Sequence, residues 1–322
     1  MELPHLHLFN PDNDLALATD VEYYTPTSAG RRMRMAGALL PLQWAKPGDA
    51  LLVDPANAGR TSEAVGSLRR DVEVISKAEK DYLPDPWGWS RAARRDFMRA
   101  GIRQELLPDD SQLDAWRDLS HRRTTILVHE LLGMEPPVEC RDVDAAMDAL
   151  RAFGGAGVVK LPWSCSGRGV VKIEDASAAW VEPRIEAMLR RQKSVMVERL
   201  CRDVDADFAL LLRFEPGGKI AERHLSLFRT DSGVYRGNYL LGDAEIMDRL
   251  NLADPDILDR AARAVAAVMH PAYTGWAGID MMKYGGGRVN PCVEINLRRT
   301  MGVVAAYMYL NGCREDYFVP MQ

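Results

Sequence analysis

Two segments about 130 residues apart constrain this chain more than any other feature of its sequence. In the first, an apolar strand ends at Lys160 and continues into a turn of serines and glycines. The backbone N–H groups of such a turn can bind phosphate oxygens, and a nearby lysine adds a positive point charge. The first segment therefore indicates a phosphate-binding turn.

The second segment carries oxygen ligands. Glu294 and Asn296 lie two residues apart in an apolar strand, so their side chains share one face. With Asp280 they form an all-oxygen set suited to Mg²⁺, which typically binds one or two carboxylates together with substrate phosphates. The two segments together predict a site for ATP and magnesium.

Composition argues against several other classes of protein. The chain has 322 residues, of which 47% are hydrophobic and 27% are charged, and this balance is typical of a globular protein of two or three lobes. A net charge of −5 argues against nucleic acid as a partner. No apolar run approaches ~18 residues, so we expect no membrane span. Five cysteines without metal-ligand spacing, and a start unlike a signal peptide, predict a cytoplasmic location.

The first third of the chain alternates strands with helical stretches, which predicts a mostly parallel sheet. The expected strands are 5–9, 50–53, 72–76 and a short one at 106–108, and the expected helices include 91–100, with Ser90 as its N-cap, and 114–119.

The rest of the chain predicts two α+β regions. In the first, an apolar helix runs to Leu132, because Gly133 and the prolines after it end it. Helices at 141–153 and 176–191 and strands at 158–160, 170–172 and 194–198 complete this lid. The second region has expected strands at 208–213, 220–228, 275–282 and 290–296 and a helix at 256–269.

The order of these motifs resembles the ATP-grasp superfamily of carboxylate–amine ligases, with a nucleotide site of the D-alanine–D-alanine ligase type. The resemblance covers roughly residues 115–305 and rests on the lysine and its Gly/Ser loop, Val197-Glu198-Arg199, Gly278-Ile279-Asp280 and Glu294-Ile295-Asn296. It implies an α/β protein of the ATP-grasp fold, in which an N-terminal parallel-sheet lobe precedes two α+β lobes that clasp the nucleotide. The implied domains are 1–115, the lid 116–198 and the C-terminal subdomain 199–322.

The resemblance also implies roles for individual residues. The family's lysine at the start of the apolar helix is replaced here by arginine, and Arg122 and Arg123 are equal candidates for phosphate contact. Asp205 and Asp207 compete for the ribose hydroxyls. The remaining expected nucleotide contacts are Lys160, Ser164, Ser166, Gly167 and Gly169 at the phosphates and Glu198, Arg199 and Leu200 at the adenine.

Several of these residues have a second interpretation. Arg168 points either at the γ-phosphate or into water, and the Gly/Ser loop could be an ordinary hairpin turn. Arg298 is expected to bind the acyl phosphate or the substrate carboxylate, and Arg223, Arg229 and Arg236 compete for that role. Glu294 could form a salt bridge with Arg298 or Arg299 instead of binding magnesium. Lys160, Arg168 and Arg298 are thus the expected catalytic residues.

The reaction implied by the resemblance is the ADP-forming ligation of a carboxylate to an amine through an acyl phosphate. A small-molecule kinase and a non-catalytic ATP-binding protein are the alternatives. The polar turn 10–14 and Tyr23-Tyr24-Thr25-Pro26 either line the second substrate's site or are an ordinary solvated turn. The sequence identifies neither substrate and leaves a homodimer open.

Overall fold

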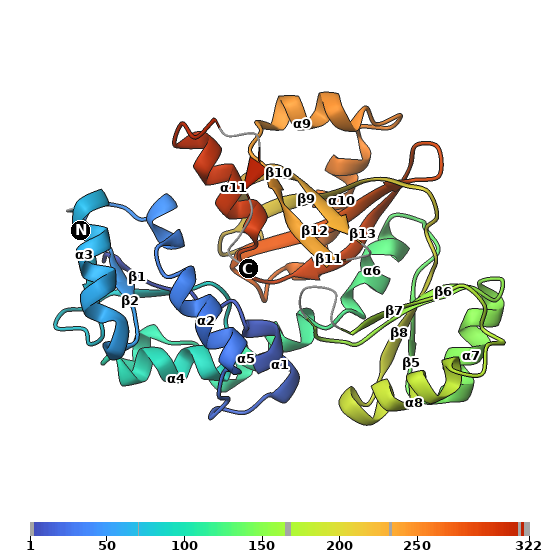
Figure 1. The fold of residues 1–322 in the computed structure, drawn as a ribbon, viewed down its shortest axis with the longest axis horizontal. Helices are drawn as coiled ribbons and strands as arrows, with labels where there is room; N and C mark the ends of the chain where they lie inside the picture. The colour runs from blue at the N-terminus through green and yellow to red at the C-terminus, as the bar shows by residue number, and fades with distance from the viewer. Residues whose placement is uncertain (1–2, 70, 165–168, 232–233, 315–316, 319–322) are drawn as a thin grey trace.

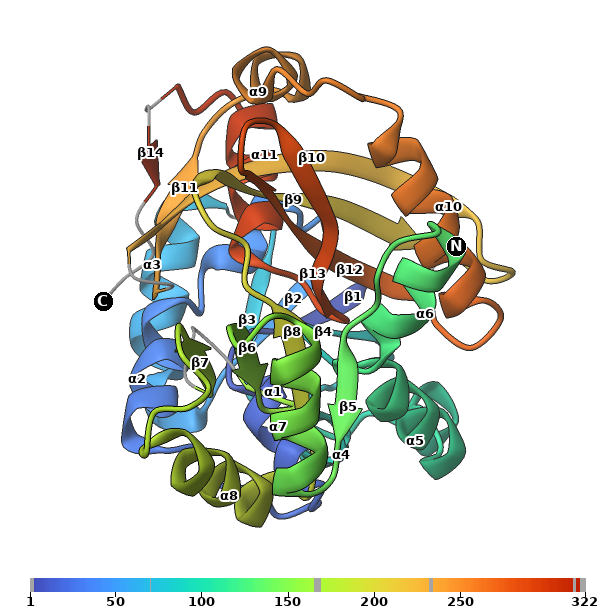
Figure 2. The ribbon, with the colours of Figure 1, turned by 90° about the vertical axis from the view of Figure 1, so that its right-hand side faces the viewer.

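Three lobes surround a common centre (Figure 1). The computed structural model describes residues 3–69, 71–164, 169–231, 234–314 and 317–318. In Figure 2 the lobe built from residues of the middle of the chain lies below the six-stranded sheet of the C-terminal lobe. Within the described ranges, no helix combines the length and the apolar character that crossing a membrane requires.

The N-terminal lobe is a four-stranded parallel sheet with helices on its faces. Its strand order is β3-β2-β1-β4, from β1 (His5–Leu8), β2 (Ala50–Leu52), β3 (Glu73–Ile75) and β4 (Leu83–Pro86). The helices are α1 (Asn13–Thr19), α2 (Ser28–Ala36), α3 (Ala58–Leu68), α4 (Arg91–Arg99) and α5 (Asp110–Leu119), with short 3₁₀ turns at Leu40–Gln43, Pro55–Asn57 and Gln104–Leu106. The predicted parallel sheet is confirmed.

Two predictions for this lobe are wrong. The expected strand at 106–108 is absent: a 3₁₀ turn ends at Leu106, and α5 begins at Asp110, earlier than expected. Asp109 caps α5 through a reciprocal pair of hydrogen bonds with Gln112, which fixes that start. The fourth strand is instead β4, which the sequence hides because its four residues include two prolines and an aspartate. By contrast, the Ser90 side chain accepts a hydrogen bond from the backbone of Ala93, as predicted for the cap of α4.

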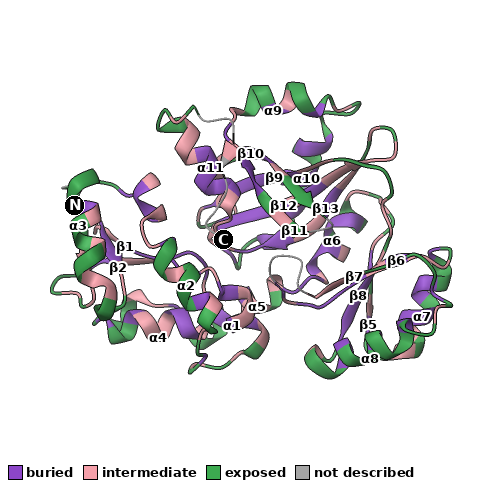
Figure 3. Ribbon diagram, viewed as in Figure 1, coloured by how far each residue is buried: buried purple, intermediate pink, exposed green. Residues whose placement is uncertain are grey.

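The lid is an antiparallel sheet covered by two helices. It contains β5 (Val138–Cys140), α7 (Val143–Ala152), β6 (Gly157–Lys160), β7 (Val170–Ile173), α8 (Val181–Gln192) and β8 (Val195–Arg199), with strand order β5-β8-β6-β7. The outer faces of α7 and α8 are exposed and their inner faces are buried against the sheet (Figure 3). The predicted pairing of the strands on either side of the Gly/Ser loop is confirmed.

The C-terminal lobe is a six-stranded antiparallel sheet of order β13-β12-β9-β10-β11-β14. Its strands are β9 (Val204–Phe214), β10 (Ile220–Asp231), β11 (Val234–Tyr239), β12 (Gly275–Tyr284), β13 (Arg288–Asn296) and β14 (Tyr317–Phe318), and its helices are α9 (Asp243–Leu250), α10 (Ile257–Met269) and α11 (Met301–Leu310). α6 (Thr124–Leu131) packs against β13 and α10, so this helix contributes to the core of the C-terminal lobe.

One face of this sheet packs into the main hydrophobic core, and the other face is partly covered by α11 and partly polar. Phe208, Leu210 and Leu212 alternate along β9 and pack with α10. Ala209 and Leu211 point the other way, toward α11. Beyond α11 the same face continues as a polar surface, because Ala209 pairs with Asp280 and Asp280 pairs with Glu294. Alternation along the strands therefore brings the predicted magnesium ligands to one side of the sheet.

Partly buried ion pairs join the N-terminal lobe to the C-terminal lobe. The Arg298 guanidinium donates to both carboxylate oxygens of Asp14, at 2.7 and 3.1 Å. Arg299 donates to both oxygens of Asp85, at 2.8 and 2.9 Å, and its backbone N–H donates to the carbonyl of Trp87 at 2.8 Å. Arg298 also forms a backbone bridge with Gly88. The C-terminal end of the parallel sheet is thus held against the end of β13.

We expect Gly88→Ala to weaken this junction. A Cβ atom at position 88 would lie 2.6 Å from Nδ2 of Asn13 and 2.9 Å from Cβ of Arg298, closer than real contacts allow. Overpacking of this kind typically costs about 1–3 kcal/mol, and urea unfolding would measure the loss. The control is Gly59→Ala, since Gly59 lies in α3 with open space around it. Alanine there should stabilise the helix by up to about 1 kcal/mol, and equal stability of the two variants would contradict the prediction.

Candidate active site

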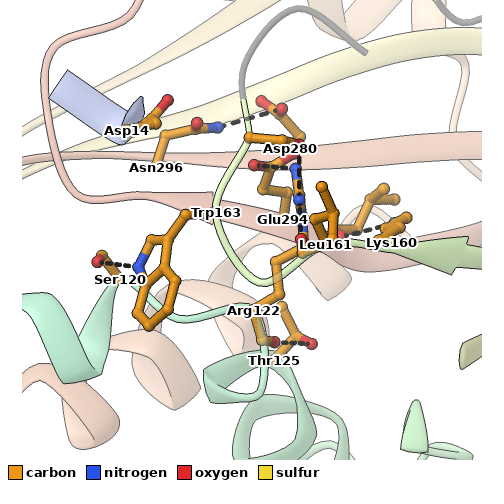
Figure 4. A network of polar contacts seen from close by, with 12 residues as sticks. Asp14, Ser120, Arg122, Thr125, Lys160, Leu161, Trp163, Asp280, Glu294 and Asn296 are labelled. Atoms are coloured by element: carbon orange, nitrogen blue, oxygen red, sulfur yellow. Dashed lines mark hydrogen bonds and ion pairs between the residues drawn. The ribbon is translucent and has the colours of Figure 1, made fainter. Parts of the chain in front are cut away.

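Asp280, Glu294 and Asn296 lie on the same face of neighbouring strands. Asp280 of β12 pairs directly with Glu294 of β13, and Asn296 pairs with Gly278, two residues before Asp280. The Asn296 side-chain amide donates to Asp280 at 3.2 Å (Figure 4). The sheet therefore brings the three predicted metal ligands together, as the two-residue spacing predicted.

The two carboxylates influence each other strongly. Burial and the neighbouring Glu294 charge raise the pKa of Asp280 to about 7, although Arg298 and Asn296 favour its ionised form. Burial also opposes the charge of Glu294, but the Arg122 guanidinium outweighs it and lowers the Glu294 pKa. Two facing carboxylates with opposed pKa shifts form a site that a cation would stabilise.

The donor set fits magnesium with help from a nucleotide. Among the described residues no group of three or more His, Cys, Asp and Glu side chains could hold a metal ion alone. Two carboxylates and an amide would need phosphate oxygens and water to complete the octahedron that Mg²⁺ prefers. The Asn296 amide oxygen accepts from Arg298 at 2.9 Å, so coordination through this oxygen requires that contact to change.

Arg122, rather than Arg123, points at this face. Arg122 is buried, and its Nη2 donates to Oε1 of Glu294 at 2.6 Å. Its Nη1 donates to the carbonyl of Leu161 and to Oγ of Ser164, the latter at 2.9 Å (Figure 4). Arg123 instead pairs with Asp118, on the exposed side of the chain. The partner of Glu294 is therefore Arg122, and not Arg298 or Arg299, which the sequence offered as alternatives.

Lys160 lies at the end of β6, beside β13, the strand that carries Glu294. The ammonium group donates to Oε2 of Glu198 at 2.6 Å and to the carbonyl of Val293 at 3.2 Å. Glu198 was expected near adenine, and its carboxylate is here the partner of the lysine. Burying a lysine at 5% exposure is tolerable because this carboxylate compensates its charge. The lysine is thus fixed in direction, beside Val293, the residue that precedes Glu294 on β13.

The Gly/Ser loop is described only at its two ends. Ser164 is buried against Arg122, while Ser166, Gly167 and Arg168 lie outside the described residues. Gly169 has a φ of 111°, which favours glycine, and its carbonyl accepts from the backbone of Leu161 at 2.8 Å. Both described ends therefore close the hairpin between β6 and β7.

The linker from the lid to the C-terminal lobe holds the other candidates. Arg199 ends β8 and forms an exposed pair with Glu135, and Leu200 follows in the linker. Asp205 is exposed, whereas Asp207 is half-buried and accepts from the Thr230 hydroxyl at 2.6 Å. Burial raises the pKa of Asp207. Asp207 pairs with Met282, two residues from Asp280, so it lies on the same face as the carboxylates.

The remaining arginines differ in position. Arg298 reaches the carboxylate face through Asn296, whereas Arg223 and Arg236 form exposed pairs with Asp259 and Asp231. Arg229 lies over the ring of Tyr317 on β14.

Sequence reasoning singled out the turn 10–14 but assigned no role to Asp14 itself, and it assigned none to Trp163. Asp14 of α1 binds Arg298, so the polar turn 10–14 meets the carboxylate face through its last residue. Trp163 packs at the base of the Gly/Ser loop (Figure 4). An aspartate in a polar turn and a tryptophan beside a glycine-rich loop are weak signals alone, because their partners lie far away in sequence.

Comparison with known proteins establishes the fold but not a close relative. No family model matches the chain, and no curated protein matches it in sequence. Among solved structures, it is similar to N5-carboxyaminoimidazole synthetase from Staphylococcus aureus complexed with ADP, at 12% identity and a TM-score of 0.53, over 83% of this chain and 68% of that chain.

Two further structures extend the likeness. D-alanyl-alanine synthetase A from Vibrio cholerae matches at 13% identity and a TM-score of 0.54, over 98% of this chain and 95% of that chain. The biotin carboxylase domain dimer of 2-oxoglutarate carboxylase from Hydrogenobacter thermophilus, in complex with MgADP, ADP and bicarbonate, also matches. Its identity is 10% and its TM-score is 0.54, over 98% of this chain and 71% of that chain. These likenesses show that the chain has the ATP-grasp fold, as its sequence predicted.

Proposed function

We propose that this protein is an ATP- and magnesium-dependent ligase that joins a small carboxylate to an amine and forms ADP. The observation that carries the proposal is the joint placement of Lys160, Arg122 and the carboxylate face of Asp280 and Glu294 within one site. Two positively charged side chains beside paired carboxylates suit a nucleoside triphosphate with its metal ion. Three solved structures of this fold, at 10–13% identity, are named as a carboxylase or as synthetases, which supports the same reaction class.

The nucleotide would lie between the lid and the six-stranded sheet. Lys160 and Arg122 would bind phosphate oxygens, the linker after β8 would hold the base, and Asp207 would bind the ribose. Magnesium bound by Asp280, Glu294 and Asn296 would neutralise charge on the phosphates that otherwise repels an attacking carboxylate. Because the lysine and arginine are already held by carboxylates, they would change partners rather than become ordered when the nucleotide binds.

The reaction has two displacements. A substrate carboxylate oxygen attacks the γ-phosphorus, the bond to the β–γ bridging oxygen breaks, and ADP leaves. The amine nitrogen then attacks the acyl carbon, phosphate leaves with the C–O bond electrons, and the nitrogen loses a proton to solvent or phosphate. Arg298 would bind the acyl phosphate or the carboxylate, in the bidentate geometry that it now uses for Asp14. Closure of the lid would exclude water that hydrolyses the acyl phosphate.

Trapping with hydroxylamine tests this reaction class. Amino acids, dipeptides and other small carboxylates would be screened with Mg-ATP for stimulated ADP release. An accepted carboxylate should yield a hydroxamate when hydroxylamine replaces the amine, because hydroxylamine attacks an acyl phosphate. Mass spectrometry would identify the product. A stable phosphate ester without hydroxamate would indicate a kinase instead, and no turnover with any acceptor would indicate a protein that only binds ATP.

A further inference from the structure

We infer that Trp163 is a positioning residue, which fixes the segment Leu161–Ser164 and thereby aims Arg122 at the phosphate and metal site. The inference rests on the proposed function and adds a residue to it. Trp163 is half-buried. It directly precedes Ser164, the first residue of the Gly/Ser loop.

The side chain of Trp163 is held from three directions by the junction of α5 and α6. Its indole N–H donates to Oγ of Ser120 at 3.0 Å (Figure 4). The guanidinium of Arg117 lies over the ring at 4.1 Å, and His121 meets the ring edge-on with centroids 4.7 Å apart. Burial lowers the pKa of His121 to about 4, so this neighbour is neutral near pH 7 and does not compete with Arg117 for the ring.

The backbone of Trp163 is held separately by the lid. Its N–H donates to the side-chain oxygen of Gln192 at 2.9 Å, and its carbonyl accepts from the side-chain nitrogen of Gln192 at 2.8 Å. Gln192 is the last residue of α8. One residue is therefore bound through its ring to the N-terminal side of the molecule and through its backbone to the lid.

The segment fixed in this way holds Arg122. The backbone N–H of Arg122 donates to the carbonyl of Pro162 at 3.4 Å. Its Nη1 is bound by the Leu161 carbonyl and by the Ser164 hydroxyl, the residues on either side of Pro162 and Trp163. With Nη1 fixed by two acceptors, the planar guanidinium can direct Nη2 only along one line, and Glu294 lies on it at 2.6 Å. Among the described residues, no hydrogen bond or ring contact joins the Trp163 side chain to Asp280, Glu294, Asn296 or Lys160, so we expect its effect on the metal site to pass through Arg122.

A double-mutant cycle on nucleotide affinity tests this role. Calorimetry would compare Trp163→Ala, Arg122→Gln and the double variant for Mg-ADP and for adenosine, which has no phosphate. We expect Trp163→Ala to weaken Mg-ADP binding at least about tenfold, since small misplacement of a preorganised group can cost up to ~100-fold. Adenosine affinity should not change. The double variant should bind Mg-ADP within about twofold of Arg122→Gln, because both changes remove one interaction.

Two further variants separate positioning from packing. Trp163→Phe keeps a ring for Arg117 and His121 but loses the bond to Ser120, so its affinity should fall between those of the wild type and Trp163→Ala. Trp180→Ala, at the start of α8, removes a tryptophan with a half-exposed side chain and should not alter either affinity.

Additive losses in the cycle, or an equal loss of adenosine affinity, would overturn the role of Trp163. A wild-type protein that binds no Mg-ADP would instead contradict the proposed function. The cycle would then be measured on the free energy of unfolding, where coupling between Trp163 and Arg122 supports the structural link and additivity rejects it.

Discussion

Glu294→Gln should abolish nucleotide-dependent turnover while the protein remains folded. Glutamine has nearly the same shape and can still accept the hydrogen bond that Arg122 now donates at 2.6 Å. It removes the negative charge that faces Asp280 and so relieves the repulsion between the two side chains. What it cannot do is act as a charged oxygen ligand for a hard cation. We expect turnover to fall by about 10²- to 10³-fold, the loss typical for one preorganised electrostatic group.

The measurements are ADP release and the magnesium dependence of nucleotide affinity, together with thermal unfolding. The melting temperature should fall only slightly, because the relieved repulsion with Asp280 offsets the lost charge partner of Arg122 and glutamine retains the hydrogen bond. Glu186→Gln is the control, since Glu186 forms an exposed pair with Arg190 on α8. A folded Glu294→Gln protein with normal turnover would reject the metal assignment.

Asp85→Asn should cause the largest loss of stability among single changes at the junction of the lobes. Asp85 binds Arg299 through two hydrogen bonds and His7 through one at 2.6 Å. His7 also contacts Asp49 at 3.1 Å, and Arg299 lies 4.8 Å from the ring centroid of Trp44. Removing one charge from this buried set leaves Arg299 without its carboxylate, and breaking such a pair typically costs about 3–5 kcal/mol.

The loss should depend on pH in a defined direction. Burial opposes the Asp85 charge, but Arg299 and His7 hold the Asp85 pKa well below its usual range. Burial also opposes the charge of Asp49, but hydrogen bonds from His7 and two backbone groups lower its pKa to about 2. Groups with lowered folded pKa values stabilise the protein above their unfolded pKa, near ~3.9, and this stability is lost as the pH falls through the folded value.

The contribution of His7 to stability depends on pH with the opposite sign. Although burial alone would lower the pKa of His7, Asp49 and Asp85 raise it, so its contribution is complete below the unfolded pKa of ~6.5. That contribution is lost as the pH rises through the folded value. The difference between wild type and Asp85→Asn should therefore be largest between about pH 4 and 6.5 and shrink below that window.

Urea unfolding from pH 2 to pH 8 would measure both effects. Asp148→Asn is the control: its side chain is 73% exposed and paired with Arg151, and such surface pairs contribute about 0.2–1 kcal/mol. A difference that stays constant with pH would show that Asp85 does not act through its charge.

The sequence predicted most elements whose pattern is local. Alternation located β1, short apolar runs located strands such as β2, β6 and β8, and the two-residue spacing of Glu294 and Asn296 was enough to place both on one face. The sequence did not reveal β4, because prolines and aspartate have low strand propensity. Pairing with β1 and a hydrogen bond from Arg299 to the Pro86 carbonyl stabilise this strand instead. Tertiary contacts decided that element.

The site could be predicted only in part, for a similar reason. Arg122 and Arg123 have the same chemistry, and only the packing of α6 against β13 determines which of them reaches Glu294. The sequence placed Glu198 at the adenine but did not reveal that its carboxylate pairs with Lys160. Trp163 acquires its significance from Ser120 and Gln192, which lie 43 and 29 residues away. No spacing rule encodes such contacts.

The pairs that join the first and last lobes also constrain how the chain can fold during synthesis. Asp14 and Arg298 are 284 residues apart, and Asp85 and Arg299 are 214 residues apart. Contacts of such separation form late, because the intervening loop must be closed first. The first lobe therefore leaves the ribosome with Asp14 and Asp85 lacking their arginine partners. Its four strands can form early, but that nascent lobe reaches full stability only when the two arginines have been translated and docked.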